Sequence, residues 1–190
     1  MTTGLFFGSF NPIHIGHLAI ANYMLSFTEI DELWFVVSPH NPFKTRQNML
    51  SENDRLHLVN LAIEGYPEYR SCSIEFRMPK PSYTIDTLAR LADRHQKRRF
   101  ALIMGSDNLE QFHKWKNSEV IVANYHRYIY PRPKTPPHLL ENISNATIVN
   151  APLMDISSSL IRRAINEKRD MPFFLHGKVY QYIKEMQFYV

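Results

Sequence analysis

The sequence lacks several features that would assign the chain to a particular class of protein. It has one cysteine, Cys72, so no disulfide can form within the chain and a reducing compartment is expected. No apolar run approaches the length that spans a bilayer. The first residues show neither the basic segment nor the cleavage site of a secretory signal. These absences predict a cytoplasmic protein with no membrane partner.

The composition that remains is that of a folded domain. The chain has 190 residues, of which 44% are hydrophobic and 21% charged, and this predicts one domain over residues 1–190. The net charge of +4 suits anionic ligands, and ordinary surface variation explains it equally well. The basic run at 94–99 ends a predicted helix and contains no interleaved aromatic residue. We interpret that run as solvated surface and expect no nucleic-acid partner.

Short apolar runs alternate with helical patterns along the chain. This alternation predicts an α/β fold with a doubly wound, mainly parallel sheet and helices on both faces, of the Rossmann-like type. In the first helix, the spacing predicts an apolar face that begins with Ile15, Leu18 and Ala19 and continues with Ala21, Met24 and Leu25. The predicted strands are 5–7, 33–37, 70–76, 100–104, 128–130 and 146–149, and the main predicted helices are 15–27, 51–62, 84–95, 157–167 and 176–187.

Polar motifs follow three of the predicted strands. The sequence GSFNPIHIGH follows the first strand, SPHNPFK follows the second, and GSDN follows the strand at 100–104. Parallel sheets of this kind bind ligands at the carboxyl ends of their strands, near a switch in strand order. The sequence therefore predicts one ligand site at that edge of the sheet.

The motif His14-Ile15-Gly16-His17 lies at the predicted start of the first helix. If both histidines are helical, their spacing puts them on one face, and each imidazole can donate a hydrogen bond. A helix N-terminus favours phosphate, and Gly16 lets a ligand approach the backbone closely. The alternatives are a core position and a zinc site. The motif is neither a Walker A loop nor GxGxxG, and the sequence supplies too few ligands for structural zinc.

A second polar motif opens a predicted helix far along the chain, at Ser157-Ser158-Ser159 with Arg162 three residues further on. Serine is a common N-cap residue, so capping alone is one explanation. Three hydroxyls in a row exceed what a cap needs, and the arginine offers a planar fork of donors for phosphate oxygens. We therefore expect this motif to bind phosphate.

Together these motifs resemble those of the bacterial nicotinate-nucleotide adenylyltransferases, a family in the HxGH nucleotidylyltransferase superfamily. The resemblance extends over nearly the whole chain. Its family patterns GGTFDPxHxGH, SYTIDTL, GxDxxxxFxxW and ISSTxIR appear at residues 7–17, 82–88, 105–115 and 156–162. The sequence departs from these patterns at four positions. Phe7 replaces glycine, Asn11 replaces aspartate, Ser159 replaces threonine, and Ser9 replaces threonine but keeps its hydroxyl.

The resemblance implies transfer of AMP from ATP to nicotinate mononucleotide, giving deamido-NAD and pyrophosphate. It implies Mg²⁺ delivered with ATP and no metal site of the protein's own. Alternatives are an adenylyltransferase for another phosphate acceptor, such as nicotinamide mononucleotide or phosphopantetheine, and a non-catalytic nucleotide-binding protein. A homo-oligomer stays open.

The resemblance also implies roles for individual residues. Three of these residues have competing explanations. Lys44 could be an exposed loop lysine, Asp107 could cap a helix, and Trp115 could serve ordinary packing. The implied catalytic residues are His14, His17 and Arg162. The implied ATP contacts are Gly8, Ser9, Phe10, His14, Gly16, His17, Gly105, Asp107, Ser157, Ser158 and Arg162. The implied mononucleotide contacts are Ser9, Lys44, Tyr83, Thr84 and Trp115.

Overall fold

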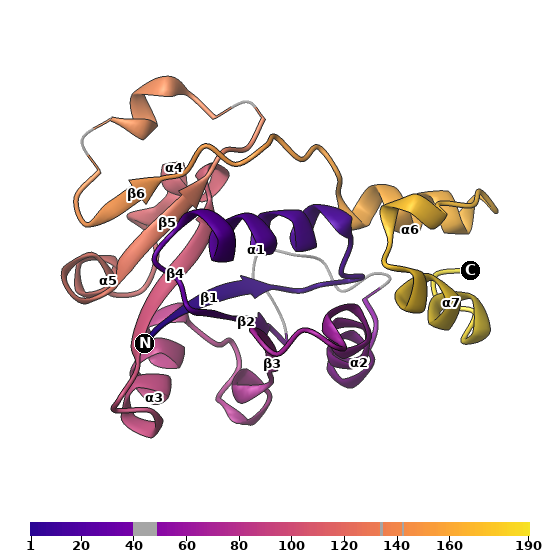
Figure 1. Cartoon of the computed structure of the whole chain (residues 1–190), viewed down its shortest axis with the longest axis horizontal. Helices are drawn as coiled ribbons and strands as arrows, with labels where there is room; N and C mark the ends of the chain where they lie inside the picture. The colour runs from indigo at the N-terminus through magenta and orange to yellow at the C-terminus, as the bar shows by residue number, and fades with distance from the viewer. Residues whose placement is uncertain (40–48, 134, 142) are drawn as a thin grey trace.

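Parallel strands form one sheet in the order β3-β2-β1-β4-β5-β6 in the computed structural model, which describes residues 1–39, 49–133, 135–141 and 143–190 (Figure 1). Every adjacent pair of these strands is parallel. The predicted doubly wound α/β fold is confirmed. The strands are β1 Thr2–Gly8, β2 Glu32–Val37, β3 Tyr69–Cys72, β4 Arg99–Gly105, β5 His126–Tyr130 and β6 Ala146–Ile148.

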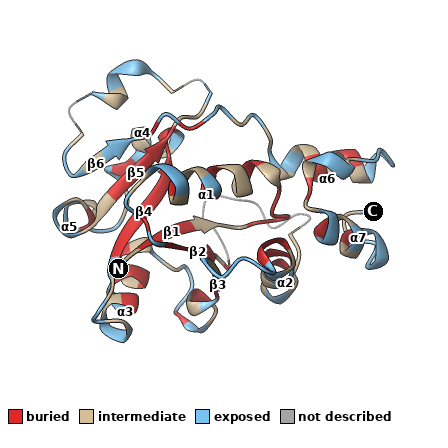
Figure 2. Cartoon of the chain, in the orientation of Figure 1, coloured by how far each residue is buried: buried red, intermediate tan, exposed pale blue. Residues whose placement is uncertain are grey.

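Helices cover both faces of the sheet because alternate strand residues are apolar on both sides. Phe6 and Phe35 pack in a core with α1, α2, α6 and α7, whereas Leu5 and Trp34 pack in a second core with α3, α4 and α5. Figure 2 shows β4 and β5 buried and the outer faces of the helices exposed. The helices are α1 Ile15–Phe27, α2 Glu52–Ile63, α3 Thr84–Arg94, α4 Leu109–Phe112, α5 Ser118–Asn124, α6 Ser158–Asn166 and α7 Gly177–Glu185.

The predicted strand at 70–76 is wrong over its second half. β3 ends at Cys72, and Ile74–Arg77 forms a short 3₁₀ helix instead. Glu75 in that helix is buried and accepts hydrogen bonds from the hydroxyls of Ser82 and Thr87, at 2.9 and 2.8 Å. A buried carboxylate needs such donors, and the turn brings it to them.

The buried face of α1 agrees only in part with the predicted one. Ala21 and Met24 are buried as predicted, whereas Ile15, Leu18, Ala19 and Leu25 are half-buried, and Gly16 and Ile20 are buried in their place. Hydrophobic residues of α1 lie on several sides of the helix, so their spacing along the sequence does not select one buried face. Packing against the sheet decides which side of the helix is covered.

The strand order reverses between β1 and β4, which lie side by side at the centre of the sheet. The connections that leave these two strands run to opposite faces, and doubly wound sheets bind ligands at such a point, beyond the carboxyl ends of the strands. β1 ends at Gly8 and β4 ends at Gly105. In Figure 1, α6 and α7 lie beyond the carboxyl end of β1, at the right of the view.

Candidate functional site

The loop after β1 is shaped by an aromatic residue in a conformation that side chains rarely adopt. Phe10 has φ of 45° and is buried. Its ring packs edge-on against Phe6 and Phe35, with centroids 5.9 and 5.5 Å away. A Cβ on Gly8 would lie 2.8 Å from the Phe10 ring, so the glycine is required at this position. Ser9 lies between them, half-buried.

The two histidines of the motif form a stacked pair at the start of α1. Their ring centroids are 3.7 Å apart, and the Phe10 ring packs edge-on against His17 at 5.1 Å. His14 is not helical, because it is the extended residue that caps α1. Its backbone N–H donates to Nδ1 of His17 at 3.3 Å, and a Cβ on Gly16 would lie 3.1 Å from the His14 ring.

The surroundings of His14 keep its imidazole neutral. The residue is 4% exposed. Burial, with a smaller contribution from the positive charge of Arg132, lowers the pKa of His14 from 6.5 to about 4. At neutral pH this ring has one N–H donor and one acceptor nitrogen. It is therefore suited to donate a hydrogen bond to phosphate, and it brings no positive charge of its own.

The motif at the start of α6 contacts the loop after β1 directly. The Ser158 hydroxyl donates to the Pro12 carbonyl at 2.9 Å, and the Arg162 guanidinium donates to the Asn11 carbonyl at 2.7 Å. Ser157 is the N-cap of α6 and accepts from a backbone N–H there at 3.2 Å. The two motifs, separated by some 140 residues in the sequence, therefore form one site.

The end of β4 brings a carboxylate to the same edge of the sheet. Gly105 is buried, and a Cβ there would collide with the Asp107 side chain. Asp107 is exposed, and the Nε atom of Arg132 lies 3.9 Å from its carboxylate. Asp107 lies in a short 3₁₀ helix after the strand and caps no helix.

The described residues implied for the mononucleotide, apart from Ser9, lie beside α3 and α4 on the face of the sheet opposite α1. Tyr83 is the exposed N-cap of α3 and Thr84 is its first residue. Lys116 lies 5.0 Å from the centre of the Tyr83 ring and pairs with Asp86 at 2.8 Å, so the segment after α4 is held beside α3. Trp115, next to that lysine, is half-buried and packs 5.2 Å from the Phe112 ring. Lys44 lies outside the described residues.

Comparison with known proteins places the chain in a family. The cytidylyltransferase-like family model matches residues 5–164. A probable nicotinate-nucleotide adenylyltransferase of Flavobacterium psychrophilum is 47% identical over all of this chain and 99% of its own length. One of Bacteroides thetaiotaomicron is 46% identical over 97% of this chain and 92% of its own. The chain belongs to the nicotinate-nucleotide adenylyltransferase family.

Solved structures support the fold of this family member. The nicotinic acid mononucleotide adenylyltransferase of Plasmodium falciparum, complexed with NaAD, superposes with a TM-score of 0.81. The match covers 99% of this chain and 97% of that one, at 20% identity. A second structure of the same enzyme, complexed with APC, gives 0.79. At this identity the likeness establishes the fold alone.

Two arginines of the site were not found by sequence reasoning. Arg132 follows β5, lies 3.9 Å from the Asp107 carboxylate and contributes through its charge to the lowered pKa of His14. Arg55 on α2 is fully buried and donates to the backbone carbonyls of Ser9, Ser38, Pro39 and Leu50. The position of Arg132 after a strand was a usable signal, because the polar motifs after β1, β2 and β4 occupy the same kind of position. Nothing in the local sequence marks Arg55, because its partners come from distant loops.

Two further observations concern metals and membranes. Within the described ranges, no group of three or more histidine, cysteine or acidic side chains could hold a metal ion. In the same part of the chain, no helix has the length and apolarity needed to cross a membrane.

The basic run at 94–99 lies at the opposite end of the sheet from the site. Arg98 of this run pairs with the buried Glu32.

Proposed function

We propose that this chain transfers AMP from ATP to nicotinate mononucleotide and releases pyrophosphate. The observation that carries the proposal is the direct contact between the two phosphate-type motifs. The hydroxyl of Ser158 and the guanidinium of Arg162 both donate hydrogen bonds to backbone carbonyls of the loop that leads to His14. Membership of the nicotinate-nucleotide adenylyltransferase family supports the same reaction and names the acceptor.

The reaction needs no general base from the protein. The nucleophile is a phosphate oxygen of the mononucleotide, and it is already ionised near neutral pH because the second pKa of a phosphomonoester is about 6. This oxygen forms a bond to the α-phosphorus of ATP while the bond from that phosphorus to the bridging oxygen of pyrophosphate breaks. The electron pair leaves on pyrophosphate. The protein therefore acts by positioning two anions and stabilising the charge that moves between them.

The site residues are suited to those two tasks. The neutral His14 and its stacked partner His17 lie at the N-terminus of α1, where the helix dipole also favours phosphate. We assign both to the transferred phosphoryl group. Arg162 and the serines at the start of α6 are assigned to the leaving pyrophosphate. Gly8, Ser9, Phe10, Gly16, Gly105 and Asp107 complete the proposed ATP site.

We extend the proposal to Mg²⁺ that arrives with ATP. Mg²⁺ retains several waters and needs few protein ligands, so the single exposed carboxylate of Asp107 would be enough to contact it. Bound in that way, the ion would neutralise charge on the phosphates. The chain itself supplies the carboxylate and, through Arg132, a fixed cation beside it.

The proposed mononucleotide site uses the other side of the sheet edge. Trp115 offers a ring for stacking on nicotinate, and the N-terminus of α3 at Tyr83 and Thr84 offers backbone N–H groups for its carboxylate. Lys44 and Ser9 are assigned to the same substrate. We place the enzyme in the cytoplasm, in keeping with its single cysteine.

The test is pyrophosphate release with ATP and Mg²⁺ and each of three acceptors. We expect turnover with nicotinate mononucleotide to exceed that with nicotinamide mononucleotide and with phosphopantetheine. Preference for either of the others would overturn the substrate assignment. No turnover with any acceptor, together with ATP binding, would instead show a nucleotide-binding protein without this activity.

A further inference from the structure

A tyrosine remote in sequence from the site motifs is hydrogen-bonded to the loop after β1. The hydroxyl of Tyr189 donates to Oδ1 of Asn11 at 2.8 Å. The same oxygen accepts the backbone N–H of Leu50 at 3.2 Å. Because a backbone N–H can only donate, the side-chain atom of Asn11 that faces it must be the oxygen. The amide orientation is therefore fixed by this partner, and Tyr189 must act as the donor.

Asn11 connects this tyrosine to the proposed phosphate-binding groups. It is 5% exposed, and its own carbonyl accepts the Arg162 guanidinium at 2.7 Å. His14 follows three residues later along the same loop. A shift of Asn11 would therefore move the partner of Arg162 and the start of α1 together.

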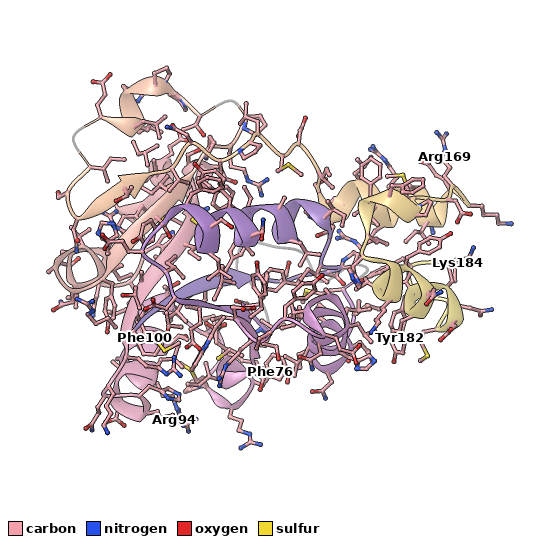
Figure 3. All side chains as sticks on the ribbon, viewed as in Figure 1. Phe76, Arg94, Phe100, Arg169, Tyr182 and Lys184 are labelled. Carbon is pink, nitrogen blue, oxygen red and sulfur yellow. The ribbon has the colours of Figure 1, made fainter. Side chains whose placement is uncertain are left out.

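The tyrosine is held by the packing of the segment that carries it. After α7, the Phe188 N–H bonds the Ile183 carbonyl at 3.0 Å, and Tyr189 has φ of 69°. Tyr182 on α7 packs edge-on against His57 of α2, with ring centroids 4.6 Å apart. In Figure 3, Arg169 and Lys184 project outward at the end of the molecule that also holds Tyr182. Tyr189 thus lies in a hydrogen-bonded turn that follows a packed helix.

The charges around Tyr189 agree with a donor role. Burial raises the pKa of the hydroxyl well above its usual range, while nearby Arg162 and Arg55 oppose that shift and Asp54 adds to it. The hydroxyl stays protonated at every pH at which the enzyme would work. The hydroxyl therefore remains able to donate its hydrogen bond to Asn11.

We propose that Tyr189 is a positioning residue for adenylyl transfer, acting through Asn11 to fix Arg162 and the loop that leads to His14. The proposal rests on the function proposed above. It also gives a role to the side chain at position 11, where this chain has asparagine and the family pattern has aspartate. Either side chain offers the oxygen that Tyr189 and Leu50 need, so the hydrogen bonds survive the exchange.

The test compares Tyr189→Phe, which removes only the hydroxyl, with the matched control Tyr180→Phe. Tyr180 lies on α7, and its hydroxyl donates to the exposed Asp170 carboxylate at 2.8 Å, not to the loop after β1. We expect Tyr189→Phe to weaken ATP binding in calorimetry, and to lower kcat/KM for ATP, by about tenfold each. The KM for nicotinate mononucleotide should stay unchanged, and Tyr180→Phe should match the unmodified protein. A role in stability alone would lower the melting temperature and leave these constants of the folded protein unchanged, and would overturn the proposal.

A double-mutant cycle with Asn11→Ala checks that the effect passes through Asn11. In the Asn11→Ala background, adding Tyr189→Phe should change ATP affinity less than about twofold. A loss of about tenfold in both backgrounds would show that Tyr189 acts by another route and would overturn the proposal. An unmodified protein that binds ATP but releases no pyrophosphate would contradict the proposed function, and the binding measurements would still decide the role of Tyr189.

Discussion

The two histidines illustrate how neighbouring residues of one type can have different surroundings. His14 is buried as the cap of α1, whereas His17 is half-buried within the helix, between the rings of Phe10 and His14. Removing His17 removes a donor without opening the deeper packing beneath His14. The two roles can therefore be tested by different measurements, turnover for His17 and stability for His14.

We predict that His17→Ala lowers kcat about 100-fold or more while the protein stays folded. The reason is that a donor aimed at developing charge is typically worth that much in turnover. The measurement is pyrophosphate release under saturating substrates, with circular dichroism to confirm the fold. The exposed His138→Ala is the control and should keep full activity. Near-normal turnover of His17→Ala would mean that the motif is structural.

His14 makes stability depend on pH in a defined window. Its pKa is about 4 in the folded protein and 6.5 without burial, so the unfolded chain binds the additional proton as the pH falls through this range. Stability is complete above pH 6.5 and is lost toward pH 4. Between pH 7 and pH 5 we expect a loss of about 2 kcal/mol from this residue.

Urea unfolding of the unmodified protein and of His14→Gln at both pH values measures that loss. The variant carries no titrating group at position 14, so its free energy of unfolding should fall less between pH 7 and pH 5. The difference between the two proteins is the contribution of His14. Equal slopes for the two proteins would show that His14 titrates normally in the fold.

At the scale of single residues, the sequence predicts contacts between residues that are close along the chain and does not reveal contacts between distant ones. The pairing of His14 with His17 is local, and short-range spacing was enough to suggest it. The depressed pKa of His14 depends on Arg132, which is distant in the sequence, and on burial by the whole fold. Arg55 likewise has partners on three other segments. Such contacts become visible only when the chain is folded.

At the scale of elements, α2 carries the residue that joins the loops after β1 and β2. Arg55 donates to the Ser9 carbonyl at 2.6 Å and to the Ser38 and Pro39 carbonyls at 2.8 and 3.0 Å. Burial lowers its pKa from the usual value for arginine, yet the guanidinium keeps enough partners to stay charged. The loop after β1, where the proposed ATP site begins, is thus held by α2, which belongs to neither the histidine motif nor the serine motif.

Replacing Arg55 by methionine should destabilise the protein by at least about 3 kcal/mol, because several buried carbonyls would lose a charged donor. Arg55→Lys should recover part of this loss, since lysine keeps the charge and loses the planar fork. Free energies of unfolding in urea measure both effects. Arg90→Met, at an exposed position on α3, is the control and should change stability by less than about 0.5 kcal/mol. A similar small change for Arg55→Met would contradict this role.

The elements that were predicted well are those whose own residues determine them. The apolar runs of β1, β2 and β4 are buried on both faces, so composition alone identified them. The 3₁₀ helix at Ile74–Arg77 was missed because it depends on hydroxyls from Ser82 and Thr87, which the strand pattern does not reveal. The first turns of α1 were assigned to the wrong face for the related reason that the sheet, and not the helix sequence, decides which side is covered, while Ala21 and Met24 were assigned correctly.

For the whole molecule, the two cores share the same strands. Phe6 belongs to the core under α1 and Leu5, its neighbour in β1, to the core under α3. Neither core can lose its packing without freeing the strand that supports the other. The predicted single domain over residues 1–190 therefore has a thermodynamic consequence, which is cooperative unfolding.

We predict one urea transition, with the same midpoint by far-ultraviolet circular dichroism and by tryptophan fluorescence. Trp34 is buried in the second core and Trp115 packs against it, so tryptophan fluorescence follows that core, while circular dichroism reports helices on both faces. Adding ATP at about 100 times its dissociation constant should raise the free energy of unfolding by about 2.7 kcal/mol for both probes. A ligand that contacts only one of two independent units would shift one transition and leave the other in place. Two separable transitions, or a shift seen by one probe only, would show that the chain folds as more than one unit.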